Sequence, residues 1–220
     1  MSRSVEIARG LESVKARIQT AAIKAGREPD EITLVVVTKT FPISDVEILK
    51  ELGVKDFGEN RDGDAAPKAG AVPGTWHFQG QIQSNKLKSI CAWAHVIHSL
   101  DDLRHFKLIA QFARHPLEIF LQCNLDGRED RGGASIHSLY PLAQMISADP
   151  VHRLAGLMAV APLALAPEKA FAELQGIHMA FMKDFPDATG LSAGMSGDFE
   201  IAISYGATHL RIGSQIMGSR

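Results

Sequence analysis

The chain alternates short apolar segments with amphipathic helical segments along its whole length, and this alternation restricts its fold more than any other feature. The first segment, ITLVVVT, is continuous and rich in β-branched residues, as expected of a strand buried on both faces of a parallel sheet. Candidate strands occupy residues 32–38, 54–58, 75–79, 95–98, 117–123, 154–160, 189–194 and 209–212. Eight such strands separated by helices predict a single α/β domain over residues 1–220, a closed (β/α)₈ TIM barrel. A doubly wound open sheet is the alternative if one strand is wrongly divided.

Helical periodicity is clearest before the first strand, where apolar residues recur at steps of three and four and end near Gly26. Ser44 and Glu47 match a capping box, which predicts a helix that runs to residue 52 and is closed by Gly53. Residues 101–114 and 167–183 are predicted as further helices. Residues 61–64 (Arg-Asp-Gly-Asp) follow the second predicted strand, and Pro67 and Gly70 lie just beyond them. Any helix in this segment should therefore be short or irregular.

Composition and charge argue against several classes of function. A hydrophobic fraction of 45% with a net charge of −2 is typical of a folded globular chain and gives no field that would attract nucleic acid. No apolar run is long enough for a membrane span or a signal peptide, so we expect a cytoplasmic protein. Cys91 and Cys123 are better interpreted as reduced buried thiols than as a disulfide or zinc site. His95 and His98 should point to opposite faces of a strand, so no metal site is expected.

Lys39 directly follows the first apolar strand, where a barrel presents its active groups. An exposed loop lysine is the more ordinary interpretation of such a residue. The ends of the last two strands favour a functional role, because barrels commonly bind phosphate there through glycine-rich loops. Strand seven leads into Met195 and Ser196, and strand eight carries Arg211 before Gly213 and Ser214. The serines could instead be simple helix N-caps.

Several motifs in order give the chain a family resemblance over essentially its whole length. It resembles the pyridoxal phosphate homeostasis proteins, which are single-domain relatives of the alanine racemase N-terminal barrel. The motifs are Val37-Thr38-Lys39, Phe57-Gly58-Glu59-Asn60, the run from Trp76 to Lys86 (WHFQGQIQSNK), Gly156-Leu157-Met158, the run from Leu191 to Ser196 (LSAGMS) and the run from Arg211 to Gly218 (RIGSQIMG).

The resemblance implies a site and a function. Lys39 would hold pyridoxal 5′-phosphate (PLP) as an aldimine, Ser196, Gly213 and Ser214 would hold its phosphate, and Arg211 would face the pyridine nitrogen. Asn60, His77 and Met195 would border the cofactor. Such proteins are regarded as carriers or buffers of PLP with no established reaction, so we expect a non-enzymatic protein whose partners are the cofactor and the apo-enzymes that receive it. An arginine at the ring nitrogen would weaken the ring as an electron sink, which favours holding the cofactor over carbanion chemistry.

Three departures from the family pattern bear on a second cofactor site. Residues 61–64 replace an aromatic-led helix start, residues 130–133 (DRGG) replace a lysine-containing loop, and the chain ends at Arg220 without a basic tail. We therefore expect no second site on such lysines.

Two other functions stay open. One is a fold-type-III PLP enzyme such as an amino-acid racemase, in which Lys39 would also act as a base and His77 could serve the opposite face. Tyr140 and Tyr205 are predicted to lie in outer helices, away from the barrel mouth. The other is a barrel enzyme that acts on a different phosphorylated substrate without using Lys39 covalently.

Overall fold

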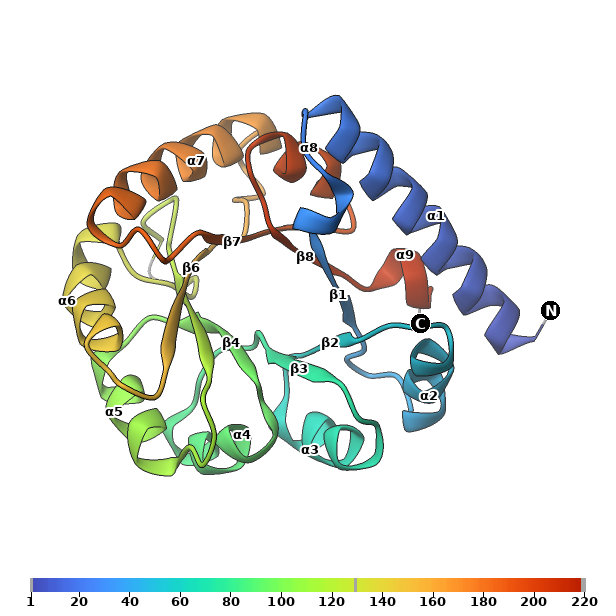
Figure 1. Cartoon of the computed structure of the whole chain (residues 1–220), viewed down its shortest axis with the longest axis horizontal. Helices are drawn as coiled ribbons and strands as arrows, with labels where there is room; N and C mark the ends of the chain where they lie inside the picture. The colour runs from blue at the N-terminus through green and yellow to red at the C-terminus, as the bar shows by residue number, and fades with distance from the viewer. Residues whose placement is uncertain (1, 129, 219–220) are drawn as a thin grey trace.

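Eight parallel strands close into a barrel at the centre of the molecule (Figure 1). The computed structural model describes residues 2–128 and 130–218. Each strand pairs with the next, and β8 pairs with β1 through Val36 and Ile212, so the predicted closed barrel is confirmed over the open sheet. The strands are β1 (Thr33–Val37), β2 (Asp56–Glu59), β3 (Thr75–Phe78), β4 (Val96–Leu100), β5 (Glu118–Gln122), β6 (Arg153–Met158), β7 (Gly190–Met195) and β8 (His209–Ile212).

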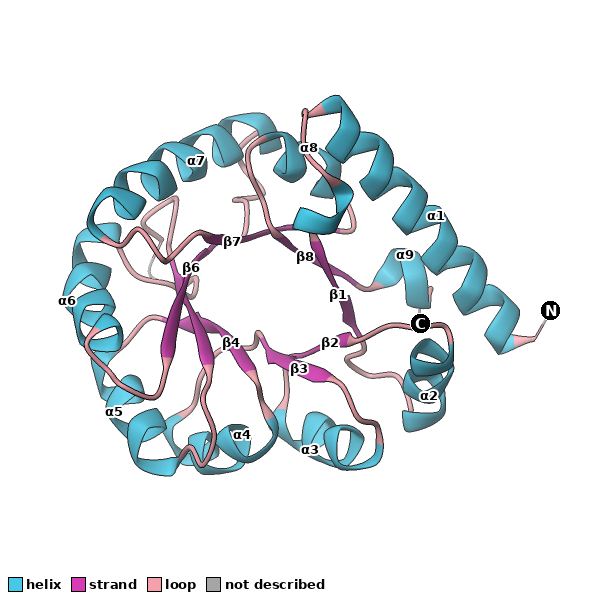
Figure 2. Cartoon of the chain, in the orientation of Figure 1, coloured by secondary structure: helices cyan, strands magenta, loops and turns pink. Residues whose placement is uncertain are grey.

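Helices form a ring around the barrel (Figure 2). They are α1 (Arg3–Lys24), α2 (Ile43–Glu51), α3 (Asp62–Ala71), α4 (Leu87–Trp93), α5 (Leu103–Phe112), α6 (Ile136–Ser147), α7 (Pro167–Asp184), α8 (Phe199–Ser204) and α9 (Ser214–Met217), with 3₁₀ turns at Pro29–Glu31 and Ser84–Lys86. None of the helices in the described residues is long and apolar enough to cross a bilayer.

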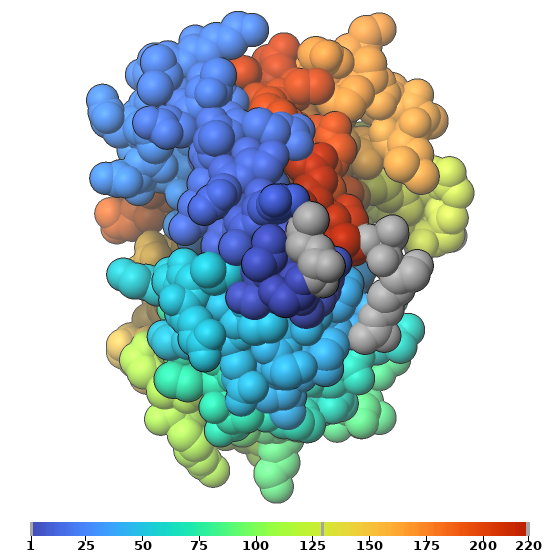
Figure 3. Space-filling view, turned by 90° about the vertical axis from the view of Figure 1, so that its right-hand side faces the viewer, coloured from blue at the N-terminus to red at the C-terminus, as the bar shows by residue number. Residues whose placement is uncertain are grey.

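Helix α1 lies on the outside of the barrel against α8 and α9 (Figures 1 and 3). Its buried stripe is the one that the periodicity predicts, running from Ile7 to Ala22. Gly10 allows the closest approach, because a Cβ there would lie 2.7 Å from the Ile216 carbonyl oxygen. Arg17 donates a hydrogen bond to Gln215, 2.5 Å away, whose amide nitrogen donates in turn to the carbonyl of Ser196. The first helix is thus bonded to the segments that follow β7 and β8.

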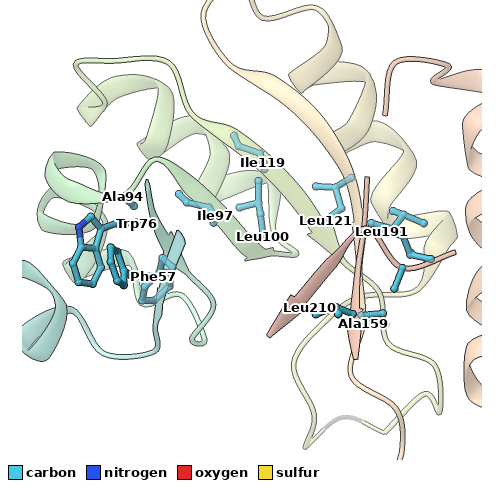
Figure 4. Packing of buried hydrophobic residues seen from close by; sticks show 14 of the residues in the cluster. Phe57, Trp76, Ala94, Ile97, Leu100, Ile119, Leu121, Ala159, Leu191 and Leu210 are labelled. Carbon is cyan, nitrogen blue, oxygen red and sulfur yellow. The ribbon is translucent and has the colours of Figure 1, made fainter. Parts of the chain in front are cut away.

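The main apolar core lies between the strands and the helices, and Figure 4 shows part of it. Phe57 and Trp76 pack there with ring centroids 5.0 Å apart. The barrel interior is different. Its small apolar cluster of Val96, Phe120, Ala155 and Met158 is separate from the main core. Buried polar side chains fill the space beside that cluster, with His98 stacked on Phe120 at 4.7 Å.

Two helix predictions were wrong in detail. The N-cap of α2 is Pro42 and no side chain caps it, because the helix begins at Ile43 and Ser44 already lies inside its first turn. Helix α3 is a full ten residues long despite containing Pro67. Acidic residues in its first turn suit the helix dipole, and its Lys68 is anchored to the barrel by buried hydrogen bonds, so tertiary contacts override the breaker residues.

Candidate functional site

A cavity of about 510 Å³ opens where the strands end in the barrel. All of its lining residues lie at the carboxyl ends of strands or just after them, which is where barrel sites are built. They are Val37, Lys39, Asn60, Gln79, Gln122, Met158, Val160, Met195, Ser196, Gly197, Arg211, Gly213 and Ser214. Seven of the eight residues predicted from the sequence therefore line this one cavity: Lys39, Asn60, Met195, Ser196, Arg211, Gly213 and Ser214.

Lys39 is exposed at this mouth and leaves a backbone that is held on several sides. The amide of Thr38 donates to the Gly58 carbonyl at 2.9 Å, and the Thr38 hydroxyl donates to Glu59 at 2.7 Å. Thr40, on the other side of Lys39, has φ of +70°, a conformation that a β-branched residue rarely adopts. The start of the Lys39 side chain is thus fixed, while its amine is free to reach into the cavity.

A buried ion pair supports that backbone from below. Lys68 on α3 donates to Glu59 at 2.6 Å and to the carbonyl of Thr38 at 2.8 Å. Lys68 is 4% exposed and Glu59 is fully buried. The other Glu59 oxygen has no partner among the described residues. This pair ties α3, β2 and the end of β1 together under Lys39.

The end of β7 and the loop after it leave two backbone amides without a partner among the described residues. Gly194 has φ of +91°, and a Cβ there would lie 2.8 Å from the side chain of Ala202, so glycine is required. Asp198 is the N-cap residue of α8, and its carboxylate accepts from the amide of Met195 at 2.6 Å. Within the described residues, no hydrogen bond involves the amides of Ser196 or Gly197, which line the cavity.

The segment after β8 also lines the cavity, through Gly213 and Ser214. Gly213 lies close to β1, since a Cβ there would be 3.1 Å from the Val37 carbonyl oxygen. Gly213 is also the N-cap residue of α9, and Ser214 is the first helical residue. The alternative that Ser196 and Ser214 serve as N-caps is therefore wrong, because Asp198 and Gly213 occupy those positions.

Arg211 brings a cation to the base of the cavity. It is 6% exposed and donates to Ser192 Oγ at 2.6 Å and to the Ala159 carbonyl at 3.0 Å. Burial lowers the pKa of Arg211 to about 10, so the guanidinium still carries its charge at neutral pH. Its remaining N–H groups are available to an acceptor in the cavity.

Two amide side chains among the lining residues each have an unpaired oxygen. Asn60 Oδ1 and Gln79 Oε1 are buried and have no hydrogen-bond partner among the described residues. Buried polar atoms are almost always paired in folded proteins, so these two oxygens are exceptions among the lining residues.

His77 does not lie on the cavity wall. It bonds to His98 at 2.8 Å and to Asp56 at 3.1 Å, inside the barrel. His77 lies too far down the barrel to reach the cavity. Gln79, two residues further along and on the same face, lines the cavity instead, and two strand residues span about 7 Å.

Several lining residues were not predicted from the sequence, among them Gln79, Gln122 and Met158. Their position at strand ends was the one signal that could have found them. Tyr140 lies in α6 and donates to Asp184 at 3.0 Å. Tyr205 follows α8 instead of lying within it. Neither tyrosine lines the cavity.

The described residues contain neither a candidate metal site nor a reactive thiol. No group of three or more His, Cys, Asp or Glu side chains there could hold a metal ion. Cys91 and Cys123 are buried, and burial raises the pKa of each thiol to about 11. Neither is a ready nucleophile, because the thiolate is the reactive form.

The fold and the site together define a barrel of the alanine racemase type, and the family model described as the alanine racemase N-terminal domain matches residues 10–220. Curated relatives narrow this further. The chain is 35% identical to the pyridoxal phosphate homeostasis protein of Mycobacterium leprae, over 98% of this chain and 93% of the relative. It is 37% identical to that of Corynebacterium glutamicum, over 94% and 99% of the two chains. The chain belongs to the pyridoxal phosphate homeostasis protein family.

Solved structures agree with this placement. PipY of Synechococcus elongatus, solved with PLP bound, superimposes with a TM-score of 0.84 at 27% identity, covering 96% of this chain and all of PipY. An alanine racemase from Corynebacterium glutamicum matches with a TM-score of 0.70 at 11% identity, over 94% of this chain and 60% of the racemase. That second likeness concerns the fold alone.

Proposed function

We propose that this protein binds PLP in the mouth cavity through the Lys39 amine and holds the cofactor for delivery to enzymes that need it. One observation supports this proposal most strongly. Lys39, Arg211, Ser196 and Ser214 all line the same cavity at the mouth of the barrel. PLP is also the ligand that the names of the curated relatives indicate and the one bound to PipY. We further propose that residues 1–220 act as one PLP-binding domain in the cytoplasm, and the free thiols of Cys91 and Cys123 suit a reducing compartment.

The residues present fit this cofactor. A cavity of about 510 Å³ is within the range of small-molecule sites. When bound, PLP supplies an aldehyde that reacts with a primary amine, and Lys39 is the amine on the wall. The hydroxyls of Ser196 and Ser214 and the unpaired amides of Ser196 and Gly197 would hold the phosphate. Arg211 would face the ring nitrogen, with Asn60 and Met195 at the edges.

The composition of the wall favours a carrier over a racemase. Racemisation needs two proton-transferring groups on opposite faces of one carbon. Among the described lining residues, Lys39 and Arg211 are the titratable ones, and an arginine does not give up its proton. His77, the candidate for the second face, lies deeper in the barrel and is bonded to His98 and Asp56.

Covalent trapping tests the site. PLP added to the protein should produce a visible absorbance band, and borohydride reduction followed by peptide mapping should locate the adduct on Lys39. Lys39→Ala should abolish the band. Lys86→Ala, which removes an exposed lysine of the neighbouring loop, should leave it unchanged. An adduct on another lysine, or no adduct at all, would overturn the proposed attachment.

Hydrogen exchange at Cα separates carrier from enzyme. The PLP-loaded protein should exchange the Cα hydrogens of L- and D-alanine, and of a panel of other amino acids, far more slowly than an enzyme. Turnover approaching about 10 s⁻¹, which is typical of enzymes, would contradict the carrier function.

A further inference from the structure

A continuous line of polar side chains runs through the barrel interior below the cavity. Arg211 Nη1 lies 2.6 Å from Ser192 Oγ, which lies 2.7 Å from His98 Nδ1. His98 Nε2 lies 2.8 Å from His77 Nδ1, and His77 Nε2 lies 3.1 Å from Asp56 Oδ1. Asp56 begins β2 and is 27% exposed at the opposite end of the barrel, whereas the other four side chains are buried. We call these five residues the barrel relay.

For neutral imidazole rings, the chemistry of its two ends sets the direction of every hydrogen bond in the barrel relay. Arg211 can only donate, so Ser192 accepts from it and gives its one hydrogen to His98 Nδ1. His98 must then carry its proton on Nε2 and donate to His77 Nδ1. His77 likewise carries its proton on Nε2 and donates to Asp56, whose carboxylate can only accept. For neutral imidazole rings, this is the one arrangement that satisfies all four bonds.

We propose that the barrel relay positions the Arg211 guanidinium toward the cavity, so that His98 and His77 set the geometry of cofactor binding without touching the cavity wall. This inference rests on the proposed function, in which Arg211 faces the cofactor ring. Arginine has a long, flexible side chain, and its position at the base of a cavity depends on what its N–H groups bind. Ser192 and the Ala159 carbonyl hold two of them.

Packing alone does not account for the barrel relay. Barrel interiors are usually filled with branched apolar residues, and polar groups buried there are costly unless they are fully bonded. His209 provides the comparison within the same interior. Its ring packs on Phe120 at 4.9 Å and lies 6.1 Å from His98, yet its hydrogen bond goes to its neighbour Thr208. His209 shares the surroundings of the barrel relay without belonging to it.

The proton positions can be measured without any cofactor. Nitrogen-15 NMR of the apo-protein should show hydrogen on Nε2 of His98 and His77 and none on Nδ1 of either ring, as the proposed bond direction requires. Either ring in the other tautomer, or protonated on both nitrogens, would break the direction of the chain and overturn the barrel relay. This result does not depend on whether the protein binds PLP.

A matched pair of variants tests the positioning role. His98→Phe keeps an aromatic ring against Phe120 but interrupts the barrel relay, and His209→Phe makes the same change outside it. His98→Phe should weaken binding of both PLP and pyridoxal by about tenfold or more and shift the absorbance maximum of the bound cofactor. His209→Phe should do neither, and equal effects of the two variants would reduce the barrel relay to packing. Failure of the wild-type protein to bind PLP would instead refute the proposed function.

Discussion

The buried Lys68–Glu59 pair is the residue-scale feature on which the Lys39 backbone most directly depends. Removing one partner of a buried ion pair leaves an uncompensated charge, which typically costs about 3–5 kcal/mol. We therefore expect Lys68→Met to lower the free energy of unfolding by about that amount, measured by urea denaturation. The double variant Lys68→Met/Glu59→Gln should recover part of the loss, because no charge then stays buried. A single variant as stable as the wild type would show that the pair contributes no stability.

Ser196 and Ser214 carry a second prediction at this scale. Each hydroxyl, if it bonds the phosphate, should contribute about 1.5–3 kcal/mol, the usual value for a hydrogen bond to a charged group. Ser196→Ala and Ser214→Ala should each weaken PLP binding by that amount in an absorbance titration. Pyridoxal, which lacks the phosphate, should bind both variants almost as well as the wild type. Equal losses for the two ligands would place the serines outside the phosphate site.

At the scale of elements, the contact between α1 and α9 positions the segment after β8, which includes Ser214. A methyl group at Gly10 would meet the backbone of α9, and overpacking of this kind costs about 1–3 kcal/mol. Gly10→Ala should therefore lower the thermal unfolding midpoint and weaken PLP binding through the displaced Ser214. Gly176→Ala is the matched control, since this glycine is also inside a helix but has open space around it.

Alanine at Gly176 should raise the stability by about 0.5–1 kcal/mol, because glycine is the poorer helix former. If both variants shifted the midpoint in the same direction, the close approach of α1 to α9 would have no energetic effect.

Elements were largely predictable from the sequence because their signals are local. The β-branched run before Lys39 and the apolar stripe from Ile7 to Ala22 each depend on a single periodicity, and both matched the structure. The start of α2 was missed because Pro42 precedes a segment that also contains the capping pattern at Ser44.

The site was predictable only in part. Residues that directly follow a strand, such as Lys39, are placed at the mouth by topology alone. The depth of His77 was not, because alternation gives the face of a strand but not the height along it. The Lys68–Glu59 pair and the barrel relay join residues from separate strands and helices. Their distances depend on the register of the closed barrel, which no local pattern contains.

At the scale of the whole molecule, buried histidines should make the protein sensitive to mild acid. Burial lowers the pKa of His98, His152, His178 and His209, in the last case to about 4. An unfolded histidine has a pKa of about 6.5, so below that pH the unfolded chain takes up protons that the folded chain refuses. Their contribution to stability is complete above pH 6.5 and is lost as the pH falls toward 4.

We expect the urea midpoint to fall steadily between pH 6.5 and pH 4.5, with each fully buried neutral histidine contributing up to about 1.4 kcal/mol per pH unit. His209→Phe should flatten this slope. Hydrogen bonds to Arg104 lower the pKa of Asp102 to about 2. The contribution of this carboxylate to stability is therefore lost mainly at lower pH than that of the histidines. A midpoint constant over the range would mean that these histidines are protonated in the folded protein.

Closure of the barrel between β1 and β8 also sets the order of events during biosynthesis. Lys39 is synthesised well before Arg211 and Ser214, which come from the eighth strand and the segment after it. Until β8 emerges, β1 has an open edge and the cavity lacks Arg211, Gly213 and Ser214. On the proposed function, the chain can therefore capture PLP only after β8 has paired with β1.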